Sequence, residues 1–355
     1  MFLIFAALFE DSPARPRTIV IAEAGVNHNG DPDLAAALIE AAAQAGAGAI
    51  KFQAFLPEAM ILPGTGKAGY QRQSGLMNED QFQMLKRLQL GPAELKRLQA
   101  KAEAEGIFFL ASVFDEISAG QLREIGARAY KIPSGEITNL PLIALVASFG
   151  MPVIISTGMA TLGEIEEAVQ TALNAGNRRL ILLHCVSSYP APYSSLNLTA
   201  IATLRAAFGL PVGYSDHAEG AEAAIAAVAL GAMVLEKHFT LDRNLPGPDH
   251  KASLGPGEFR QLVESIRKVE SAFGDGRKVL AEAERETRAL TRKSLVANQP
   301  IAAQALITRE MIGCKRPGNG LPPKYLGYFI GARATRFIAQ DTLLGWSDAV
   351  KGEED

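Results

Sequence analysis

Short apolar, β-branched runs alternate along the chain with longer alanine-rich stretches of helical periodicity from Thr18 onward. This alternation is typical of parallel βα units. Two of the helical stretches end at Gly46 and Gly176, where glycine suits a left-handed helix cap. The pattern predicts eight strands, at residues 18–24, 49–52, 107–112, 129–132, 153–156, 180–184, 212–215 and 233–238.

Eight strands, seven crossovers and a closing helix over residues 256–273 predict a (β/α)8 TIM barrel. An open doubly wound sheet is the alternative, but the glycine-rich dinucleotide fingerprint that often follows its first strand is missing. Residues 56–81 form an insertion after the second strand, rich in Gly, Pro, Gln and Asn, which we expect to be a lid or binding loop.

The alternation stops after Phe273, and half of residues 274–293 are charged, as in a solvated helix or linker. The remainder contains short apolar runs broken by Pro and Gly, which favours a small, turn-rich β-type module. We therefore expect a barrel over residues 1–274, a charged linker over 275–293 and a second domain over 294–355.

Composition narrows the functional class. The net charge is −3 and no Lys/Arg-rich run is present, which argues against nucleic-acid or membrane-surface binding. The only cysteines, Cys185 and Cys314, do not form a disulfide scaffold or a zinc pair, so a reducing cytoplasm is expected. The apolar start, residues 1–9, lacks a basic flank and is too short to span a membrane. We expect an edge strand there, or a mis-assigned start.

Polar residues follow the predicted strands at every carboxyl end, which is where the active site of such a barrel lies. They include Glu23, Lys51, Gln53, Ser112, Lys131, Ser134, Glu136, Ser156, Ser187, Tyr189 and Ser215. Chance would not place a hydroxyl, charge or imidazole at all eight ends.

Histidines fall at four of these ends, and His217 and His238 lie on neighbouring strands. Histidine is the commonest metal ligand, so these two are predicted to share a divalent ion, with Glu23 and water completing an open site. For His28 and His184, hydrogen bonding to neighbouring loops is the better interpretation.

Lys51 and Lys131, with nearby serines, form a pattern suited to phosphate or carboxylate. Two alternatives remain open: an internal ion-pair network with Glu23 and Glu136, or a lysine that forms a Schiff base. Arg316, before a Pro-Gly-Asn-Gly turn, is placed to reach another surface, although a solvated turn charge is the ordinary explanation.

These residues lie in segments that resemble those of the sialic acid synthase (N-acetylneuraminate synthase) family, which includes legionaminic acid synthases. The resemblance covers nearly all of the chain past Thr18, and it is carried in family order by IAEAGVNHNGD, IKFQAF, YKIPSGEITNLPLI, STGMATLGEIEEAV, LLHCVSSYPAP, GYSDH, EKHFTLDRNLPGPDHKASL and KRPGNG. It implies a TIM barrel followed by an antifreeze-like (SAF) domain.

The resemblance also implies the reaction: condensation of phosphoenolpyruvate with an N-acylated hexosamine to give a nine-carbon keto sugar acid and phosphate. N-acetylmannosamine is the expected sugar, and a 2,4-diacetamido-6-deoxy hexose of the legionaminic acid type is the alternative. Manganese on His217 and His238 is implied, with magnesium or cobalt as other candidates.

Further roles follow from the resemblance residue by residue. Arg316 matches an arginine inserted into the partner's barrel, so a domain-swapped homodimer is implied. Glu23, Gln53, Glu136, Tyr189 and Asp249 match the metal and sugar side. Positions that hold phosphoenolpyruvate are matched by Lys51, Lys131, Ser112, Ser134, Ser156 and Ser215.

The chain departs from the family pattern at a few positions. Ser112 and Val113 stand where the family has Thr-Pro, Ser187 aligns with an asparagine that binds phosphoenolpyruvate in some members, and Ala218 replaces a common threonine. The rival functions are a metal-dependent or Schiff-base keto-sugar aldolase and a non-catalytic sugar-binding protein.

Overall fold

The computed structural model describes residues 4–10, 16–67 and 79–351. Contacts divide the chain into two compact units, Met1–Phe273 and Gly274–Asp355. Part of the predicted lid, residues 68–78, lies outside the described residues.

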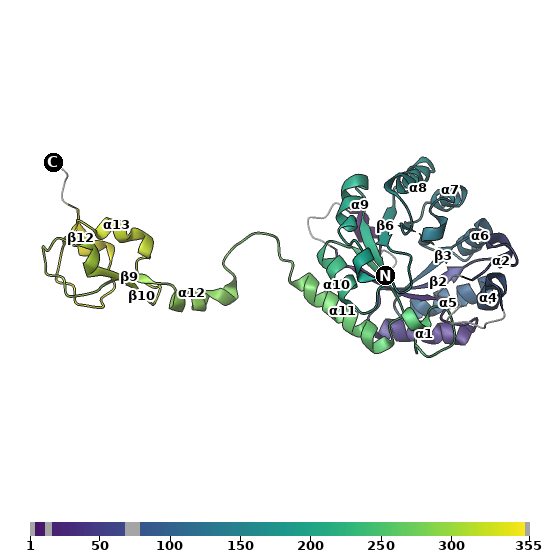
Figure 1. The fold of residues 1–355 in the computed structure, drawn as a ribbon, viewed down its shortest axis with the longest axis horizontal. Helices are drawn as coiled ribbons and strands as arrows, with labels where there is room; N and C mark the ends of the chain where they lie inside the picture. The colour runs from purple at the N-terminus through teal and green to yellow at the C-terminus, as the bar shows by residue number, and fades with distance from the viewer. Residues whose placement is uncertain (1–3, 11–15, 68–78, 352–355) are drawn as a thin grey trace. The chain divides into compact units, whose positions relative to one another are not determined.

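The first unit is a closed barrel of eight parallel strands (Figure 1), as the alternation predicts. Each strand pairs with its neighbours in chain order, and β8 pairs with β1 to close the ring. The strands are β1 (Ile19–Gly25), β2 (Ala49–Ala54), β3 (Phe108–Val113), β4 (Tyr130–Ile132), β5 (Val153–Ser156), β6 (Leu180–Cys185), β7 (Val212–Asp216) and β8 (Val234–His238).

Helices surround the strands of this unit, and most follow a single strand. They are α1 (Pro32–Gln44), α5 (Pro92–Ala104), α6 (Glu116–Glu124), α7 (Leu140–Ser148), α8 (Leu162–Asn174), α9 (Ala200–Phe208), α10 (Glu222–Ala229) and α11 (Pro256–Ser271).

Local sequence explains where these helices begin and end. The side chain of Asp31 accepts backbone hydrogen bonds at the start of α1, and Pro32 occupies the first turn, where its missing N–H costs nothing. Thr161 and Glu164 form a reciprocal capping box on α8. After α8, Gly176 adopts φ +89°, the left-handed conformation expected of it.

The barrel interior is apolar at its amino end, where Ile21, Phe108, Leu183 and Val234 belong to one buried cluster. The chain start packs against it: residues Ala6–Phe9 form a 3-10 helix, η1, and the Phe5 ring meets Phe108 edge-on at 5.3 Å. The expectation of an edge strand is therefore wrong for the described residues 4–10. The physical reason is that a closed barrel has no edge to pair with.

In its described residues, the insertion after β2 contains the short helices α2 (Pro57–Met60) and α4 (Gln81–Leu88), which pack on a small apolar cluster with Phe55. The Gln81 amide donates to the Thr65 carbonyl at 3.0 Å, which ties the start of α4 to the stretch that follows α2. Asp115 also accepts from the Leu56 amide at 2.8 Å. The insertion is thus fixed beside the carboxyl end of the barrel.

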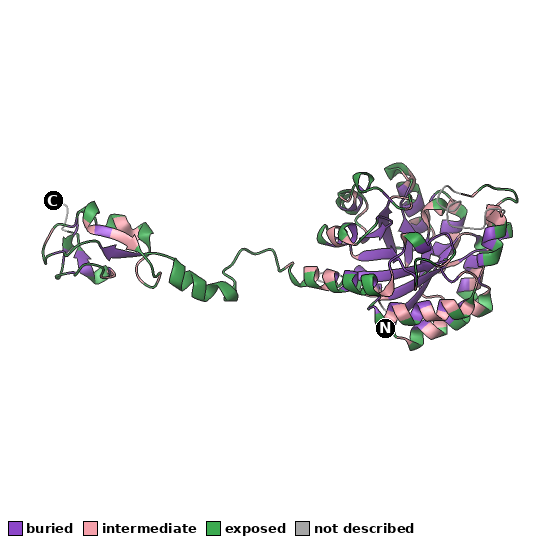
Figure 2. Ribbon diagram, turned by 60° about the horizontal axis from the view of Figure 1, so that its bottom comes forward, coloured by how far each residue is buried: buried purple, intermediate pink, exposed green. Residues whose placement is uncertain are grey.

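The second unit begins with exposed residues, which include η5 (Glu282–Glu284) and α12 (Arg285–Thr291), coloured green for exposed in Figure 2. Its small apolar core contains Leu295, Ile312, Phe329 and Ile338. Its strands are β9 (Ser294–Ala297) paired with β10 (Ile312–Lys315), and β11 (Arg333–Ala334) paired with β12 (Ala349–Val350). The short helices are α13 (Leu326–Phe329) and the 3-10 turns η6 (Arg309–Met311), η7 (Pro323–Tyr325) and η8 (Trp346–Asp348).

None of the helices in the described ranges is both long and apolar enough to cross a membrane.

Candidate active site

Side chains alternate across each barrel strand, and this alternation selects the polar residues that face the interior. On β8, Val234 belongs to the interior cluster, so Glu236 and His238 point inward as well. Lys237 points outward and pairs with Asp216 of β7 at 2.7 Å. The amino half of the interior is therefore apolar, and the carboxyl half is polar.

These inward side chains line one pocket of about 400 Å³ at the carboxyl end of the barrel. It is lined by Glu23, Lys51, Gln53, Met60, Gln81, Leu85, Ser112, Phe114, Lys131, Pro133, Ser134, Gly135, Ser156, Met159, Ser187, Tyr189, Ser215, His217, Glu236, His238 and Asp249.

Lys51 is the centre of a buried charge cluster in this pocket. Its ammonium lies 2.8 Å from Glu23 Oε2 and 3.6 Å from Glu236 Oε1, and it donates to Ser112 Oγ at 2.8 Å. Burial alone would lower the pKa of Lys51, but the two carboxylates raise it above its usual value. Lys51 is therefore a fixed cation.

The two carboxyls around Lys51 differ strongly. Burial raises the pKa of Glu23 to about 7, against the opposing effect of Lys51. Burial would also raise the pKa of Glu236, but the charges of Lys51 and Lys131 lower it to about 2. Two neighbouring carboxyls with divergent proton affinities are typical of acid–base sites.

Lys131 lies in the same pocket without a carboxylate at ion-pair distance among the described residues. Its ammonium donates to the Ile132 carbonyl at 3.1 Å, and its side chain is 2% exposed. Burial, together with the charge of Lys51, lowers the pKa of Lys131. A buried cation with spare donors is a strong point of attachment for an anion.

Small side chains crowd a corner beside Lys131. The Gly158 amide donates to Ser134 Oγ at 3.0 Å, and Ser134 Oγ lies 3.2 Å from Cys185 Sγ. A Cβ added to Gly158 would lie 2.3 Å from Ser187 Oγ and 2.8 Å from Ser134 Oγ. The absence of a side chain at Gly158 lets these hydroxyls converge.

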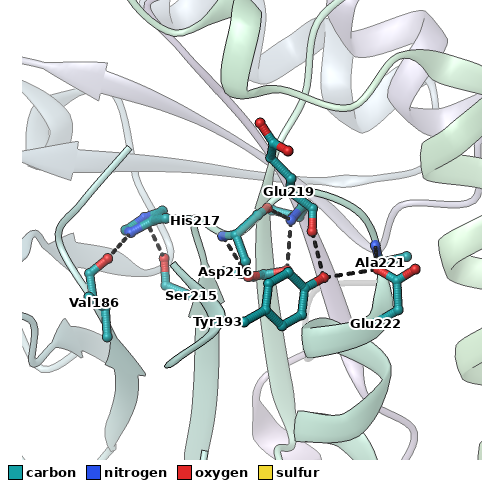
Figure 3. A network of polar contacts seen from close by, with 10 residues as sticks. Val186, Tyr193, Ser215, Asp216, His217, Glu219, Ala221 and Glu222 are labelled. Atoms are coloured by element: carbon teal, nitrogen blue, oxygen red, sulfur yellow. Dashed lines mark hydrogen bonds and ion pairs between the residues drawn. The ribbon is translucent and has the colours of Figure 1, made fainter. Parts of the chain in front are cut away.

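His217 and His238 lie side by side, with ring centroids 5.6 Å apart, and the Tyr189 ring packs on His217 at 4.3 Å. Burial lowers the pKa of both, that of His238 to about 3, so both imidazoles are neutral. His217 Nδ1 donates to the Val186 carbonyl at 2.8 Å, so the lone pair is on Nε2, which lies 3.4 Å from Ser215 Oγ (Figure 3).

This pair fits a divalent ion in its donor chemistry. Both rings are in the neutral form that binds metals, and His238 Nδ1 is buried without a hydrogen-bond partner in the described structure. Within the described residues, no three His, Cys, Asp or Glu side chains converge as a complete cage. An ion bound there would need water or substrate in its remaining positions, as in catalytic sites.

Asp249 occupies the side of the pocket formed by the loop after β8. A Cβ on Gly25 would lie within 3.4 Å of the Glu23, Gln53 and Asp249 side chains, so these groups meet around Gly25. Gly25 has φ +51°, which favours glycine there. Burial raises the pKa of Asp249 to about 6.

One wall of the pocket is apolar, in contrast to the rest. Met60, Leu85 and Phe114 line it, and they pack with the cluster beneath the β2–α4 insertion. A ligand in this pocket therefore meets cations and hydroxyls on one side and hydrocarbon on another.

The structure brings all the predicted site residues of the barrel into this lining except Glu136. Glu136 instead accepts a hydrogen bond from Asn139 at the start of α7, at 2.8 Å. Arg316 is an exposed residue of the second unit, directly after β10, so its role at a pocket stays a prediction. The ion-pair network that the sequence allows as an alternative forms around Lys51, with Glu23 and Glu236 as its partners rather than Glu136.

Sequence reasoning placed Glu236 among the polar strand ends but gave it no role in the site, and it missed Cys185, which lies beside Ser134. Both are two residues from a position that faces inward, so the period of two along each strand was the available signal. His184 faces the opposite side, where its Nε2 donates to the Leu196 carbonyl at 2.7 Å. His28 Nδ1 accepts from the Gly30 amide at 3.0 Å, so both histidines have the loop hydrogen bonds expected of them.

Comparison with known proteins gives two family matches. The NeuB family matches residues 38–278, and the SAF domain matches residues 292–350. The chain is 46% identical over 330 residues to the N,N'-diacetyllegionaminic acid synthase of Campylobacter jejuni, which covers 92% of this chain and 99% of the relative.

Two further proteins are similar over most of their length. An N,N'-diacetyllegionaminic acid synthase of Legionella pneumophila is 43% identical over 331 residues, 92% of this chain and 93% of the relative. The crystal structure of an N-acetylneuraminic acid synthetase from Leptospira borgpetersenii, in complex with citrate, is 36% identical, with a TM-score of 0.67 over 77% of this chain and 91% of that one.

Proposed function

This chain belongs to the NeuB family and carries a SAF domain, and from that premise we propose that it is a nonulosonic acid synthase. The proposed reaction joins phosphoenolpyruvate, an N-acylated hexosamine and water into a nine-carbon 2-keto sugar acid and phosphate. The observation that carries the proposal is the presence, in one pocket, of the buried Lys131 ammonium, which has no carboxylate at ion-pair distance in the described structure, and of two neutral imidazoles at His217 and His238.

The cationic side of the pocket suits phosphoenolpyruvate. Lys51 and Lys131 supply point charges for its phosphate and carboxylate, and Ser134, Ser156 and Ser187 supply hydroxyl donors around them. Lys51, Lys131 and Ser156 are only 2–3% exposed, so water screens their attraction to a bound anion weakly. The same contacts hold the enol carbon in a fixed direction, which removes much of the entropic barrier.

The sugar would occupy the side formed by the histidine pair, Gln53 and Asp249. A divalent ion bound by His217 and His238, with manganese as the expected metal, supplies Lewis-acid polarisation of the sugar aldehyde. Gln53 and Asp249 offer hydrogen bonds to the sugar's hydroxyl or acylamino groups. Tyr189, which packs on His217, limits how far the ring can turn.

The bonds that change follow from this placement. The enol carbon of phosphoenolpyruvate attacks the sugar aldehyde carbon, whose oxygen takes a proton and becomes a hydroxyl. Water then adds at C2 of the former phosphoenolpyruvate and gives up a proton. The C–O bond to phosphate breaks as the new C2 hydroxyl loses its proton, which leaves the ketone and phosphate. Glu23, buried at 2.8 Å from Lys51, is the carboxyl we assign to take the proton from that water. Lys51 and Lys131 stabilise the negative charge of the departing phosphate.

We propose a 2,4-diacetamido-6-deoxy hexose, the legionaminic acid type of sugar, rather than N-acetylmannosamine. Two relatives named for N,N'-diacetyllegionaminic acid are 46% and 43% identical, against 36% for the solved N-acetylneuraminic acid synthetase. The apolar wall of Met60, Leu85 and Phe114 supports the same choice. A C6 methyl and a second acetamido methyl gain from hydrocarbon contact, whereas a C6 hydroxyl does not.

We further propose that the protein works as a domain-swapped homodimer, in which Arg316 of one subunit reaches the sugar side of the other subunit's barrel. Arg316 is exposed directly after β10, where no ion pair holds it in the described structure. An arginine so presented suits hydrogen bonding to acyl oxygen or hydroxyl groups.

The test is phosphate release from phosphoenolpyruvate with manganese, in three parallel reactions: with the 2,4-diacetamido-6-deoxy hexose, with N-acetylmannosamine and without sugar. We expect sugar-dependent release that is faster with the diacetamido sugar. Equal or faster release with N-acetylmannosamine contradicts the choice of sugar and leaves the reaction class intact. No release in any reaction, together with borohydride trapping of pyruvate on the protein, would replace the synthase with an aldolase.

A further inference from the structure

The loop after β7 carries His217, and it is held by contacts from the neighbouring β6–α9 loop. The Val186 carbonyl accepts from His217 Nδ1 at 2.8 Å, and the Ala191 amide donates to the His217 carbonyl at 2.9 Å. Further along, the Tyr193 hydroxyl donates to the Glu219 carbonyl at 2.8 Å. Figure 3 shows the first and third of these contacts on either side of Asp216.

A second set of contacts holds the same loop from the outer face of the barrel. Asp216 Oδ1 accepts from the Ala218 amide at 3.0 Å, and Lys237 donates both to Asp216 Oδ2 at 2.7 Å and to the Ala218 carbonyl at 2.5 Å. Both side chains are fully buried, with exposed fractions of 0% and 1%. The two residues that flank His217 are thus tied to one ammonium.

An ion pair this deep is costly to desolvate, and apolar side chains of the same volume usually serve stability as well or better. Unlike apolar side chains of the same volume, Asp216 and Lys237 make directed hydrogen bonds to the amide and the carbonyl of Ala218. These bonds restrict the backbone on either side of His217, and with it the direction of the imidazole.

We propose that Asp216 and Lys237 are positioning residues that aim His217 Nε2 into the pocket and thereby set the affinity for a divalent ion. The proposal rests on the metal site proposed above. Neither side chain lines the pocket, because both point away from it on β7 and β8. Their effect passes through the main chain of residues 216–218, as outer-shell partners of metal-ligating histidines generally act.

The test measures manganese binding directly, with electron paramagnetic resonance of free Mn²⁺ titrated into the full-length protein. One variant is the double substitution Asp216→Asn with Lys237→Met, which removes both charges at once. A second variant, Asp216→Asn alone, decides the question if circular dichroism shows that the double variant is not folded. The matched control is Asn177→Ala, before β6, which removes the side-chain hydrogen bonds to the Ala147 and Met151 carbonyls and from the Arg179 amide.

Outer-shell substitutions of this kind weaken metal binding by about 10- to 100-fold. We expect the dissociation constant for Mn²⁺ to rise by about 10-fold or more in the Asp216 and Lys237 variants, and to stay near the wild-type value in Asn177→Ala. We also expect excess Mn²⁺ to restore phosphate release in a folded variant, since only the aim of the histidine has changed.

Unchanged Mn²⁺ affinity in a folded Asp216 variant overturns the inference, as does an equal loss in Asn177→Ala. A wild-type protein that binds no Mn²⁺ overturns it together with the proposed metal site. Phosphate release by the wild type reports separately on the proposed reaction, so the two failures are distinguishable.

Discussion

Replacing Gly158 by alanine tests whether the serine corner holds the phosphoenolpyruvate. The new Cβ would lie 2.3 Å from Ser187 Oγ, 2.8 Å from Ser134 Oγ and 2.9 Å from Cys185 Sγ, all below ordinary contact distance. Because these are ends of side chains, the hydroxyls are expected to move rather than the backbone. Ser187 Oγ would have to withdraw by about 1 Å, which is enough to break a hydrogen bond.

The size of the effect follows from the charge of the ligand. A hydrogen bond to a charged group contributes about 1.5 to 3 kcal/mol. Losing those from Ser134 and Ser187 would cost at least about 3 kcal/mol, which corresponds to roughly a 150-fold rise in KM for phosphoenolpyruvate if binding is lost uniformly. The KM for the sugar should change little.

Gly135 offers a matched control, because it also lines the pocket and a Cβ there would meet nothing within 4 Å. The assay is phosphate release as a function of phosphoenolpyruvate at saturating sugar, with thermal unfolding followed by circular dichroism. We expect Gly158→Ala to raise KM strongly and Gly135→Ala to leave it near the wild-type value. Equal KM values in two folded variants would refute the assignment of this corner to the anion.

Three further predictions address pH, sugar choice and the second unit. Burial lowers the pKa of His28 to about 4. As the pH falls, the imidazole is therefore protonated in the unfolded state before it is protonated in the folded state. The contribution of the neutral His28 to the free energy of unfolding is present near pH 7 and is lost as the pH falls through the pKa of the unfolded state. Between pH 7 and pH 5 the wild type should lose about 2 kcal/mol more stability than His28→Asn, as measured by urea unfolding followed by far-ultraviolet circular dichroism; parallel pH profiles would contradict this. Met60→Gln should reduce the preference for the diacetamido sugar over N-acetylmannosamine by about 10-fold in kcat/KM, because it places a polar group in the apolar wall. The control is Met159→Gln, at a pocket residue that is 73% exposed. An equal loss of sugar preference in both variants would contradict a role for the apolar wall in the choice of sugar. Arg316→Ala should raise KM for the sugar and leave KM for phosphoenolpyruvate nearly unchanged, with Lys315→Ala as the neighbouring control; an unchanged sugar KM sinks the proposed role of Arg316.

Much of the architecture is local and could be predicted from the pattern alone. Apolar runs and alanine-rich stretches alternate because strands buried on both faces must be apolar and the covering helices must be amphipathic. The polar strand ends were also visible, since an ionisable residue such as Lys51 or Glu23 directly after an apolar run departs from that pattern. These features belong to single segments, and they needed no knowledge of which segments meet.

Partnerships between segments could not be predicted in the same way. Lys51 meets Glu23 because β1 and β2 pair in that register, and it meets Glu236 only because the ring closes between β8 and β1. The sequence alone does not distinguish Glu136 from Glu236. The register of β8 turns the Glu236 side chain toward the pocket, whereas the Glu136 side chain, in the loop after β4, accepts a hydrogen bond from Asn139. The chain start shows the same limit: its apolar run predicts burial, but the closed barrel decided that it would pack as a 3-10 helix.

The sequence by itself determined the strand and helix pattern, the two-part organisation and the residue types that can bind an anion and a divalent ion. The tertiary structure decided which lysine is paired with carboxylates and which is hydrogen-bonded only to a carbonyl in the described structure, which histidines face the pocket, and where an apolar wall lines it. The physical reason is that propensity and hydrophobic periodicity act within a segment, whereas burial, pKa and the direction of a side chain depend on the neighbours that closure of the barrel supplies.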